Sequence, residues 1–74
     1  MFQIEKFGKR LRKLRTDAKE NQKVIADLLG ISITQISEME NGKTTTSFER
    51  LVMLCEHYQV SADYLLGLTA EAEE

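Results

Sequence analysis

The stretch that decides the fold is NQKVIADLLGISITQISEMENGK, from Asn21 to Lys43. Its apolar residues and its glycine fall where two short helices joined by a tight turn need them. Asn21 can cap the first helix through its side-chain oxygen, Gly30 can end that helix in the left-handed conformation, and Ser32 can cap the second helix. Two helices with so short a link must cross steeply.

The crossing of these two helices needs a small core of its own. Ala26 supplies the small side chain where the two backbones meet, and apolar residues at helical spacing face into the corner. We expect the corner to be filled by Ile25, Leu29, Ile31, Ile36 and Met39.

The same residues resemble a known motif. Counted from Gln22, the five apolar residues, the small Ala26 and the turn residue Gly30 match the signature positions of the twenty-residue helix-turn-helix motif. The segments FGKRLRKLR, ENGK and SFERLVMLCEHYQVSADYLLG resemble the rest of the five-helix domain of phage repressors, Cro proteins and their bacterial relatives, the XRE type. The resemblance covers residues 4–68 and implies an all-α, five-helix DNA-binding domain of the lambda-repressor-like type.

The segments on either side of the motif have helical patterns and no strand pattern. Apolar residues three and four apart predict a first helix through Ile4, Phe7, Leu11, Leu14 and Ala18. Thr46 and Glu49 form a capping-box pattern that opens a fourth helix. The wide apolar face of that helix would comprise Phe48, Leu51, Val52, Leu54, Cys55 and Tyr58. Ser61 can cap a short fifth helix, and Gly67 can stop it.

Length and composition agree with one small domain. A chain of 74 residues with 42% hydrophobic content can bury a single core. We expect the DNA-binding domain to span residues 1–68 and the small, acidic residues 69–74 to form a frayed tail. No apolar run approaches the ~20 residues of a membrane span, and residues 1–6 lack the layout of a secretion signal. These features predict a cytoplasmic, nucleoid-associated protein.

The net charge of −2 hides an uneven distribution. Residues 1–24 carry eight Lys and Arg against three acids, a charge of +5, whereas residues 25–74 carry two against nine, a charge of −7. Attraction to phosphates depends on where the cations lie, so a basic end beside an acidic body is compatible with DNA binding.

The residue types that perform catalysis are scarce. The lone histidine, His57, lacks the second histidine or cysteine that a metal site needs, so we expect a partly exposed helix residue. Cys55 lies two positions away and projects from a different side of the helix, where a buried, small apolar role fits it. The four glycines are scattered and form no phosphate-binding loop. We therefore predict no enzyme, no cofactor and no metal.

Helix geometry and the resemblance together identify the candidate base-reading residues. Side chains opposite the buried Ile36 and Met39, near the start of the recognition helix, would enter the major groove first. They are Ile33, Thr34, Ser37 and Glu38. The apolar atoms of this set can contact thymine methyl groups, and Glu38 can accept a hydrogen bond from a cytosine amino group. Glu38 has an alternative role, as an exposed acid that avoids phosphates or pairs with a nearby lysine.

Contacts to the DNA backbone have a second set of candidates. Gln22 combines an amide donor with the free N–H groups and positive end of a helix, which suits a phosphate. The residues after the recognition helix resemble a second phosphate-contacting segment and are Asn41, Lys43 and Thr44. Arg10 contacts either a phosphate or solvent. The resemblance implies that Arg15 pairs with Glu40 and ties the first helix to the third.

Two departures from the family pattern affect the second helix. Glu20 stands where relatives usually have an apolar residue, so we expect a looser junction. Val24 and Leu28 form an apolar pair where relatives are more often polar. The pair either widens the core face or receives Phe2 and the N-terminal arm.

The favoured function is sequence-specific DNA binding as a transcriptional regulator, of which a repressor is the leading form. One recognition helix reads too few bases for stringent specificity, so we expect a homodimer on a palindromic operator with half-sites ~34 Å apart. We expect the dimer to form through the fifth helix, since Tyr64, Leu65 and Leu68 cannot all be buried. The regulator would be controlled either by its own concentration or by a regulatory protein partner. The alternative function is a protein-interaction module, such as an antitoxin or adaptor, built on the same fold.

Overall fold

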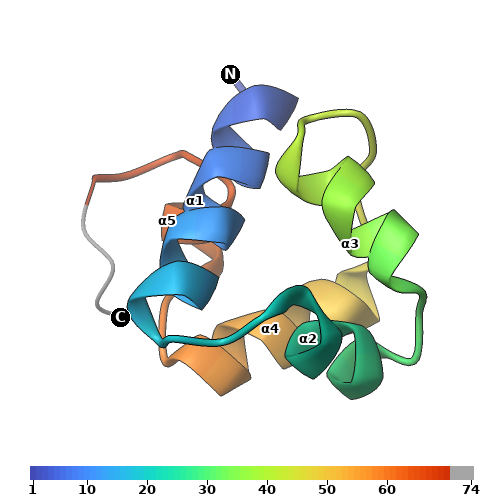
Figure 1. Cartoon of the computed structure of the whole chain (residues 1–74). Helices are drawn as coiled ribbons and strands as arrows, with labels where there is room; N and C mark the ends of the chain where they lie inside the picture. The colour runs from blue at the N-terminus through green and yellow to red at the C-terminus, as the bar shows by residue number, and fades with distance from the viewer. Residues whose placement is uncertain (71–74) are drawn as a thin grey trace.

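The computed structural model describes residues 1–70 of the 74. These residues form five helices and no strand (Figure 1). The helices are α1 (Ile4–Asp17), α2 (Gln22–Leu29), α3 (Ile33–Glu40), α4 (Phe48–Tyr58) and α5 (Ala62–Leu65). The expected all-α, five-helix architecture with a central pair of short helices is therefore confirmed. None of the described helices is long and apolar enough to span a membrane.

The helices pack around one core. α1 packs against α3 and α5, while α4 passes behind α2 and reaches back to α5 (Figure 1). Side chains from every helix meet in the interior, and the buried apolar residues are Phe7, Leu11, Ile25, Ala26, Leu29, Ile36, Met39, Leu54, Val60 and Leu65. Ile31 and Cys55 pack against this core while half-buried.

The turn between α2 and α3 has the predicted local chemistry. The Asn21 side chain accepts a hydrogen bond from the Val24 N–H, and Gly30 ends α2 with φ 69°. Ser32 caps α3 in a complete capping box, in which the Ser32 Oγ accepts from the Gln35 N–H at 3.1 Å. The Gln35 side chain in turn accepts from the Ser32 N–H at 2.9 Å. These bonds satisfy free N–H groups at both helix starts and fix the angle at which α3 leaves the core.

The start of α4 differs from the prediction. Ser47, and not Thr46, is the cap residue, because its Oγ accepts from the Arg50 N–H at 3.2 Å. The expected apolar face is also too wide. Phe48 is 88% exposed and Val52 is 54% exposed, four residues apart on the outer side of the helix, whereas Leu54 is fully buried.

α1 and α3 touch backbone to backbone at Gly8. A Cβ atom at Gly8 would lie 2.5 Å from the carbonyl oxygen of Met39 and 2.6 Å from that of Glu40. Only glycine fits such an approach without moving one helix. The expected α1 stripe is partly wrong at its end, because Ala18 is the C-cap residue and is exposed.

Two residues other than glycine adopt the left-handed backbone conformation. Lys19 has φ 59° in the link between α1 and α2, and Gln59 has φ 57° where it ends α4. Beyond α5, Gly67 has φ 81° and turns the chain. Of the predicted frayed tail, residues 71–74 lie outside the described part of the chain.

Candidate DNA-binding interface

The outer face of α3 carries the four predicted base-reading residues. Ile36 and Met39 are buried and hold the helix on the core. On the other side, Ile33 is 48% exposed and Thr34 is exposed. Ser37 and Glu38, one turn further on, are half-buried. The predicted side chains therefore share one accessible strip of the helix.

The side chain of Glu38 forms no hydrogen bond or ion pair within residues 1–70. The pairing with a nearby lysine that was one alternative for this residue is thus absent from the described part of the chain. Its carboxylate lies on the same helix as the exposed Ile33 and Thr34. A ligand that meets this face of α3 would meet the Glu38 carboxylate.

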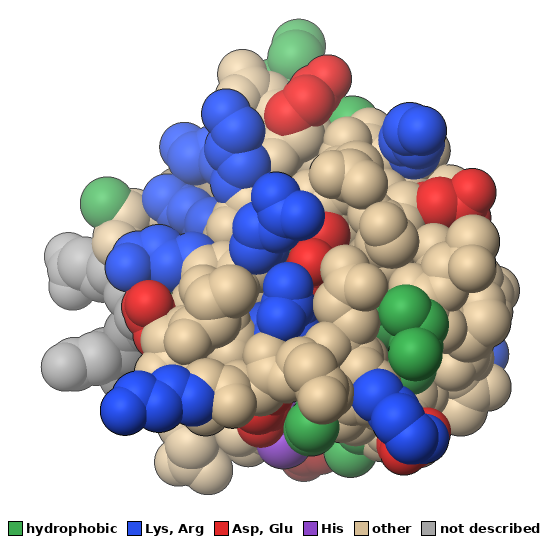
Figure 2. Space-filling model, in the orientation of Figure 1, with side chains coloured by type: hydrophobic (Ala, Val, Ile, Leu, Met, Phe, Trp, Pro, Cys, Tyr) green, Lys and Arg blue, Asp and Glu red, His purple; other side chains and the backbone are tan. Residues whose placement is uncertain are grey.

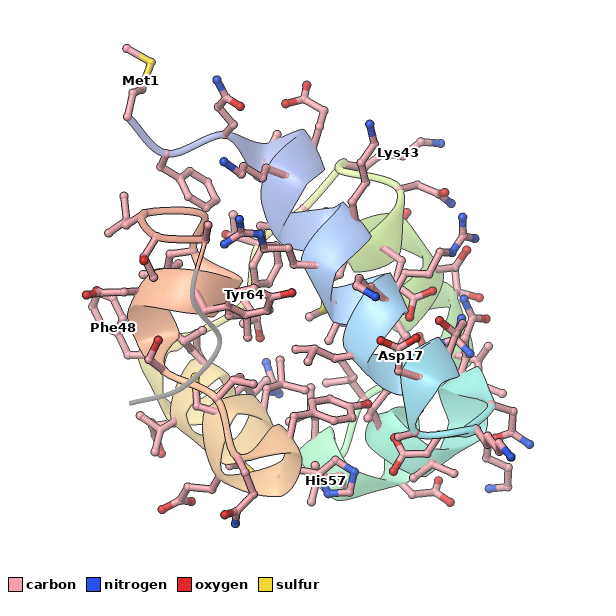
Figure 3. The ribbon with its side chains drawn as sticks, turned by 90° about the vertical axis from the view of Figure 1, so that its left-hand side faces the viewer. Met1, Asp17, Lys43, Phe48, His57 and Tyr64 are labelled. Atoms are coloured by element: carbon pink, nitrogen blue, oxygen red, sulfur yellow. The ribbon has the colours of Figure 1, made fainter. Side chains whose placement is uncertain are left out.

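The end of α3 delivers Lys43 to the surface. Asn41 is the C-cap residue, and Gly42 follows it with φ 74°. The N–H of Lys43 then donates to the Glu38 carbonyl at 2.9 Å, and the N–H of Gly42 donates to the Met39 carbonyl at 3.2 Å. This pair of bonds is the Schellman arrangement, which closes the helix and fixes the direction of the next residues. Lys43 and Thr44 are both exposed, and Figure 3 shows Lys43 projecting near the first half of α1.

Glu40 lies fully buried at the centre of a polar network. Arg15 donates to it through both edges of its guanidinium, from Nε to Oε2 at 2.6 Å and from Nη2 to Oε1 at 3.0 Å. The predicted Arg15–Glu40 ion pair is therefore present. Gln22 donates from Nε2 to Oε1 at 3.1 Å, and Arg15 also donates from Nη1 to the Glu20 carbonyl at 2.8 Å. The network joins α1, the start of α2 and the end of α3.

The carboxyl group of Glu40 stays ionised despite its burial. Burial alone would raise its pKa, but the hydrogen bonds from Arg15 and Gln22 and the nearby positive charges outweigh that effect, so the net pKa shift is downward. The same hydrogen bond raises the pKa of Arg15. Gln22 thus has an anchoring role in addition to the phosphate role that the sequence predicted.

Arg12 is a candidate that the sequence reasoning missed. Its Nε lies 3.6 Å from Oε1 of Glu40, the oxygen that also accepts from Gln22, and its side chain is 55% exposed. Two guanidinium groups around one carboxylate leave a net positive charge beside the start of α2. Only the fold could bring Arg12 and Gln22 to the same oxygen.

Arg10 has a structural role that neither predicted alternative included. Its guanidinium donates to the backbone carbonyls of Tyr64 and Thr69 and lies 4.3 Å from the centre of the Tyr64 ring. This cation–π contact and the two hydrogen bonds hold α5 and the following residues against α1. A contact between Arg10 and a phosphate would require these bonds to break.

The junction before α2 is tighter than the sequence suggested. The carboxylate of Glu20 accepts from the Tyr58 hydroxyl at 2.7 Å and lies 2.7 Å from Nε2 of His57. Burial and the bond to Glu20 raise the pKa of Tyr58. The expectation of a looser junction was wrong, because a polar link to α4 replaces the missing apolar contact. His57 is an exposed helix residue, as expected, and it takes part in this link.

The apolar pair on α2 does not receive the N-terminal arm. Leu28 packs against the core, whereas Val24 is exposed. Phe2 lies instead against Phe7 of α1, with ring centres 6.3 Å apart. The alternative in which Phe2 covers Val24 and Leu28 was therefore wrong, and Leu28 alone widens the core face.

Positive charge gathers over α1. Figure 2 shows Lys and Arg side chains gathered from the upper left to the centre of the molecule, over α1, with further cations at the upper right, the lower left and the lower right. Acidic side chains are scattered around them. Residues 1–70 contain no group of three or more His, Cys, Asp or Glu side chains able to hold a metal. The interface is thus a polar surface with a basic side.

Comparison with protein families and curated sequences gives consistent matches. Residues 8–71 match the family model described as "Helix-turn-helix domain". The chain is 34% identical over 67 residues to the uncharacterised HTH-type transcriptional regulator YobD of Bacillus subtilis, covering 90% of this chain and 60% of that protein. It is 38% identical over 60 residues to YonR, a prophage-derived regulator of the same bacterium, covering 81% and 56%. The chain thus spans about three fifths of the length of these relatives.

Solved structures resemble the fold closely. The P22 c2 repressor, crystallised with a synthetic operator, has a TM-score of 0.75 and 35% identity, over 81% of this chain and 91% of that one. The restriction-modification controller protein C.AhdI of Aeromonas hydrophila has a TM-score of 0.73 and 29% identity, over 84% and 94%. The family match over residues 8–71 includes α2, α3 and the segment after α3, which present the candidate interface.

Proposed function

Because the chain belongs to the helix-turn-helix domain family, of the XRE type found in phage repressors and their bacterial relatives, we propose that it is a transcriptional regulator that represses from a palindromic operator as a homodimer. The observation that carries the proposal is the buried Glu40 network, which fixes the start of α2 and the end of α3 on one scaffold. A helix-turn-helix domain contacts DNA from these two segments. Neither the family nor the curated relatives are enzymes.

The proposed base-reading and phosphate-contacting roles follow from where the side chains lie. Base edges are read by the exposed strip of α3, formed by Ile33, Thr34, Ser37 and Glu38. Phosphates on either side are held by Gln22 and Arg12 at the start of α2, and by Asn41, Lys43 and Thr44 after α3. Arg10 is left out of this set because its guanidinium is bonded to α5. Residues 1–68 are the DNA-binding unit, which acts on the cytoplasmic nucleoid.

A dimer supplies the specificity that one α3 lacks. An exposed strip of four side chains can distinguish only a few base pairs, and each correct contact contributes about 1–3 kcal/mol of discrimination. Two copies related by a twofold axis double the contacts on half-sites about one helical turn apart. The curated relatives are longer than this chain, so the half-site spacing is proposed for this chain and not for them.

The test is a gel shift against salt with matched charge variants. DNA flanking the protein's own gene should be retarded, and Gln22→Ala and Lys43→Ala should weaken binding to all sequences alike. Lys43→Ala should also lower the slope of log affinity against log salt by about one unit. Lys13→Ala removes an equal charge from α1, where Lys13 pairs with Asp17, and should leave the slope unchanged.

Three results would count against the proposal. A change of preferred bases in Gln22→Ala, without loss of total affinity, would reject its phosphate role. An absence of retardation even at low salt would reject DNA binding and favour the protein-interaction module. A salt slope that falls equally in Lys13→Ala and Lys43→Ala would show attraction by net charge and no defined phosphate contact.

A further inference from the structure

The side of the molecule around α4 exposes an unusual amount of apolar surface. Phe48, 88% exposed, and Val52, 54% exposed, lie one turn apart on the outer side of α4. An aromatic ring this exposed gains nothing from the core of its own chain. Exposed apolar side chains that gather in one place, and do not occur singly, mark an interaction surface.

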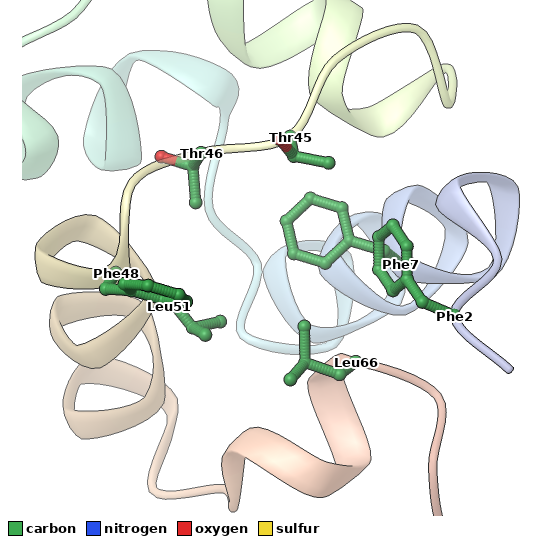
Figure 4. Close-up of a pocket in the computed structure, with 7 residues that line it drawn as sticks. All are labelled: Phe2, Phe7, Thr45, Thr46, Phe48, Leu51 and Leu66. Carbon is green, nitrogen blue, oxygen red and sulfur yellow. The ribbon is translucent and has the colours of Figure 1, made fainter.

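An apolar hollow lies directly beside Phe48. Its volume is about 220 Å³, and its lining residues are Phe2, Phe7, Thr45, Thr46, Phe48, Leu51 and Leu66. Figure 4 shows Phe48 on one side of the hollow, next to Leu51, and the Phe2 and Phe7 rings on the opposite side. The hollow is thus a gap between the N-terminal arm, α4 and the end of α5, with a projecting ring on its edge. We define Phe48, Val52 and the hollow as the α4 patch.

We propose that the α4 patch is the homodimer interface and that its occupant is a second copy of this chain. This inference deepens the proposed function, since it names the surface through which the proposed dimer forms. In a twofold dimer the same patch meets itself, so it must carry both a projection and a hollow that receives it. The α4 patch has both, and the Phe48 ring of each copy enters the hollow of the other.

Charges around the patch fit the same arrangement. Glu49, exposed, follows the projecting Phe48, whereas Lys6 lies against Gly67, next to the Leu66 side of the hollow. In the proposed dimer, Glu49 beside the projecting ring faces Lys6 of the other copy, which lies beside the hollow. Opposite charges at the rim of an interface set its register and disfavour other pairings.

The α5 surface that the sequence suggested is a poorer candidate. Leu65 is fully buried, and the ring of Tyr64 is covered by the Arg10 guanidinium. Only Leu68 of that set is well exposed, at 57%. The α4 patch also leaves the proposed DNA contacts free, because Phe48 and Lys43 project from opposite sides of the molecule in Figure 3.

Sedimentation equilibrium over a wide concentration range tests the inference on the full chain. The wild type should pass from monomer toward dimer. Phe48→Ala should raise the dissociation constant by about 30-fold, the loss typical of a central aromatic anchor. Leu68→Ala, which truncates another exposed apolar side chain outside the patch, should change the dissociation constant less than about twofold. Circular dichroism melting of each variant verifies that the fold is intact.

Exchanging the charges of Glu49 and Lys6 provides an independent test. Glu49→Lys should weaken the dimer, and adding Lys6→Glu should restore it, because the pair would then face across the axis with signs reversed. A strictly monomeric wild type, or an unchanged dimer in Phe48→Ala, would overturn the inference. Failure of the two proposals is distinguishable. A Phe48-dependent dimer that does not bind DNA rejects the proposed function alone, and cooperative operator binding unchanged in Phe48→Ala rejects the α4 patch alone.

Discussion

At the scale of single residues, the buried carboxylate of Glu40 is the most consequential group in the chain. Its side chain is fully buried, and its charge is balanced by donors from two other helices. Removing a partner from such a pair leaves a buried charge without compensation, which costs far more than breaking an exposed pair. The exposed pair of Lys13 and Asp17, one turn apart on α1, is the natural comparison.

Arg15→Ala should lower the free energy of unfolding by about 3–5 kcal/mol. The free energy of unfolding of Arg15→Lys should lie between those of the wild type and Arg15→Ala. An ammonium keeps the charge but cannot make the two parallel bonds of a guanidinium. Urea unfolding measures both, and Lys13→Ala should be close to wild type. A double-mutant cycle with Glu40→Gln that gave no coupling would remove the pair from this account of stability.

The same residue predicts how stability depends on pH. The pKa of Glu40 is lower in the folded chain than its ordinary value of 4.5, so the folded state favours the ionised form. The resulting stabilisation is fully present above pH 4.5 and is lost as the pH falls through the folded pKa. Unfolding measured from pH 7 to pH 3 should show a fall in stability below pH 4.5 that is smaller in Glu40→Gln. Parallel profiles for the two proteins would contradict the assignment.

Glu38 is the residue whose two possible roles predict different outcomes. A carboxylate on the recognition helix is repelled by phosphates, so its neutralisation should strengthen binding to random DNA. If Glu38 also accepts a hydrogen bond from cytosine, Glu38→Gln loses about 1–3 kcal/mol of discrimination at one base pair in each half-site. Site selection from a random library, with both proteins, measures this. Identical preferred sequences would reject the base-reading role.

At the scale of helices, the contact between α1 and α3 depends on Gly8. Ala is the better helix former by roughly 1 kcal/mol, so local propensity favours Gly8→Ala. The two carbonyl oxygens within 2.6 Å of the new Cβ oppose it. Because those atoms are backbone and cannot turn aside, we expect a net loss of about 1–3 kcal/mol in the free energy of unfolding and a shift of α3.

The control is Gly30→Asn, where no atom lies within 4 Å and asparagine tolerates the left-handed conformation. Thermal unfolding that found Gly8→Ala as stable as wild type would show that the helices separate freely.

Helices with local signals were predictable, and contacts between distant segments were not. The turn from Asn21 to Ser32 was predicted from side chains that bond within three residues of themselves, and the structure confirms each cap. The link from Glu20 to Tyr58 joins residues 38 positions apart, and no local pattern indicates it. The same is true of Arg10 with Tyr64. The start of α4 was misplaced by one residue because threonine and serine are both good caps and stand side by side.

At the scale of the whole molecule, one core serves all five helices. A chain of this length is expected to have roughly 4–11 kcal/mol of stability, at 0.05–0.15 kcal/mol per residue. Leu54→Ala removes a fully buried side chain at the centre and should cost about 2–5 kcal/mol, a large share of that total. Loss of helix content and loss of DNA binding should therefore occur at the same temperature. Two separate transitions would show that α2 and α3 fold without α4.

The candidate site was predictable in outline for a related reason. The strip on α3 follows from helical periodicity alone, so its four residues could be placed from the sequence. The roles of the charged residues around this strip could not be predicted from the sequence. Arg10 and Arg12 are two residues apart on one basic helix, and only the packing of α5 and Glu40 separates a bonded structural cation from an accessible one.

Lys19 and Gln59, whose backbone conformations are left-handed, are two positions at which substitution would raise the stability of this chain. Each holds a conformation that disfavours a β-carbon, so each stores strain that glycine or asparagine would relieve. At Gln59 such a replacement leaves every cation in place, and thermal tolerance would rise with the attraction to DNA unchanged. At Lys19 the same replacement removes a positive charge beside the proposed interface. An engineer, or a lineage moving to hotter surroundings, would find the first change free of consequence for binding and the second in conflict with it.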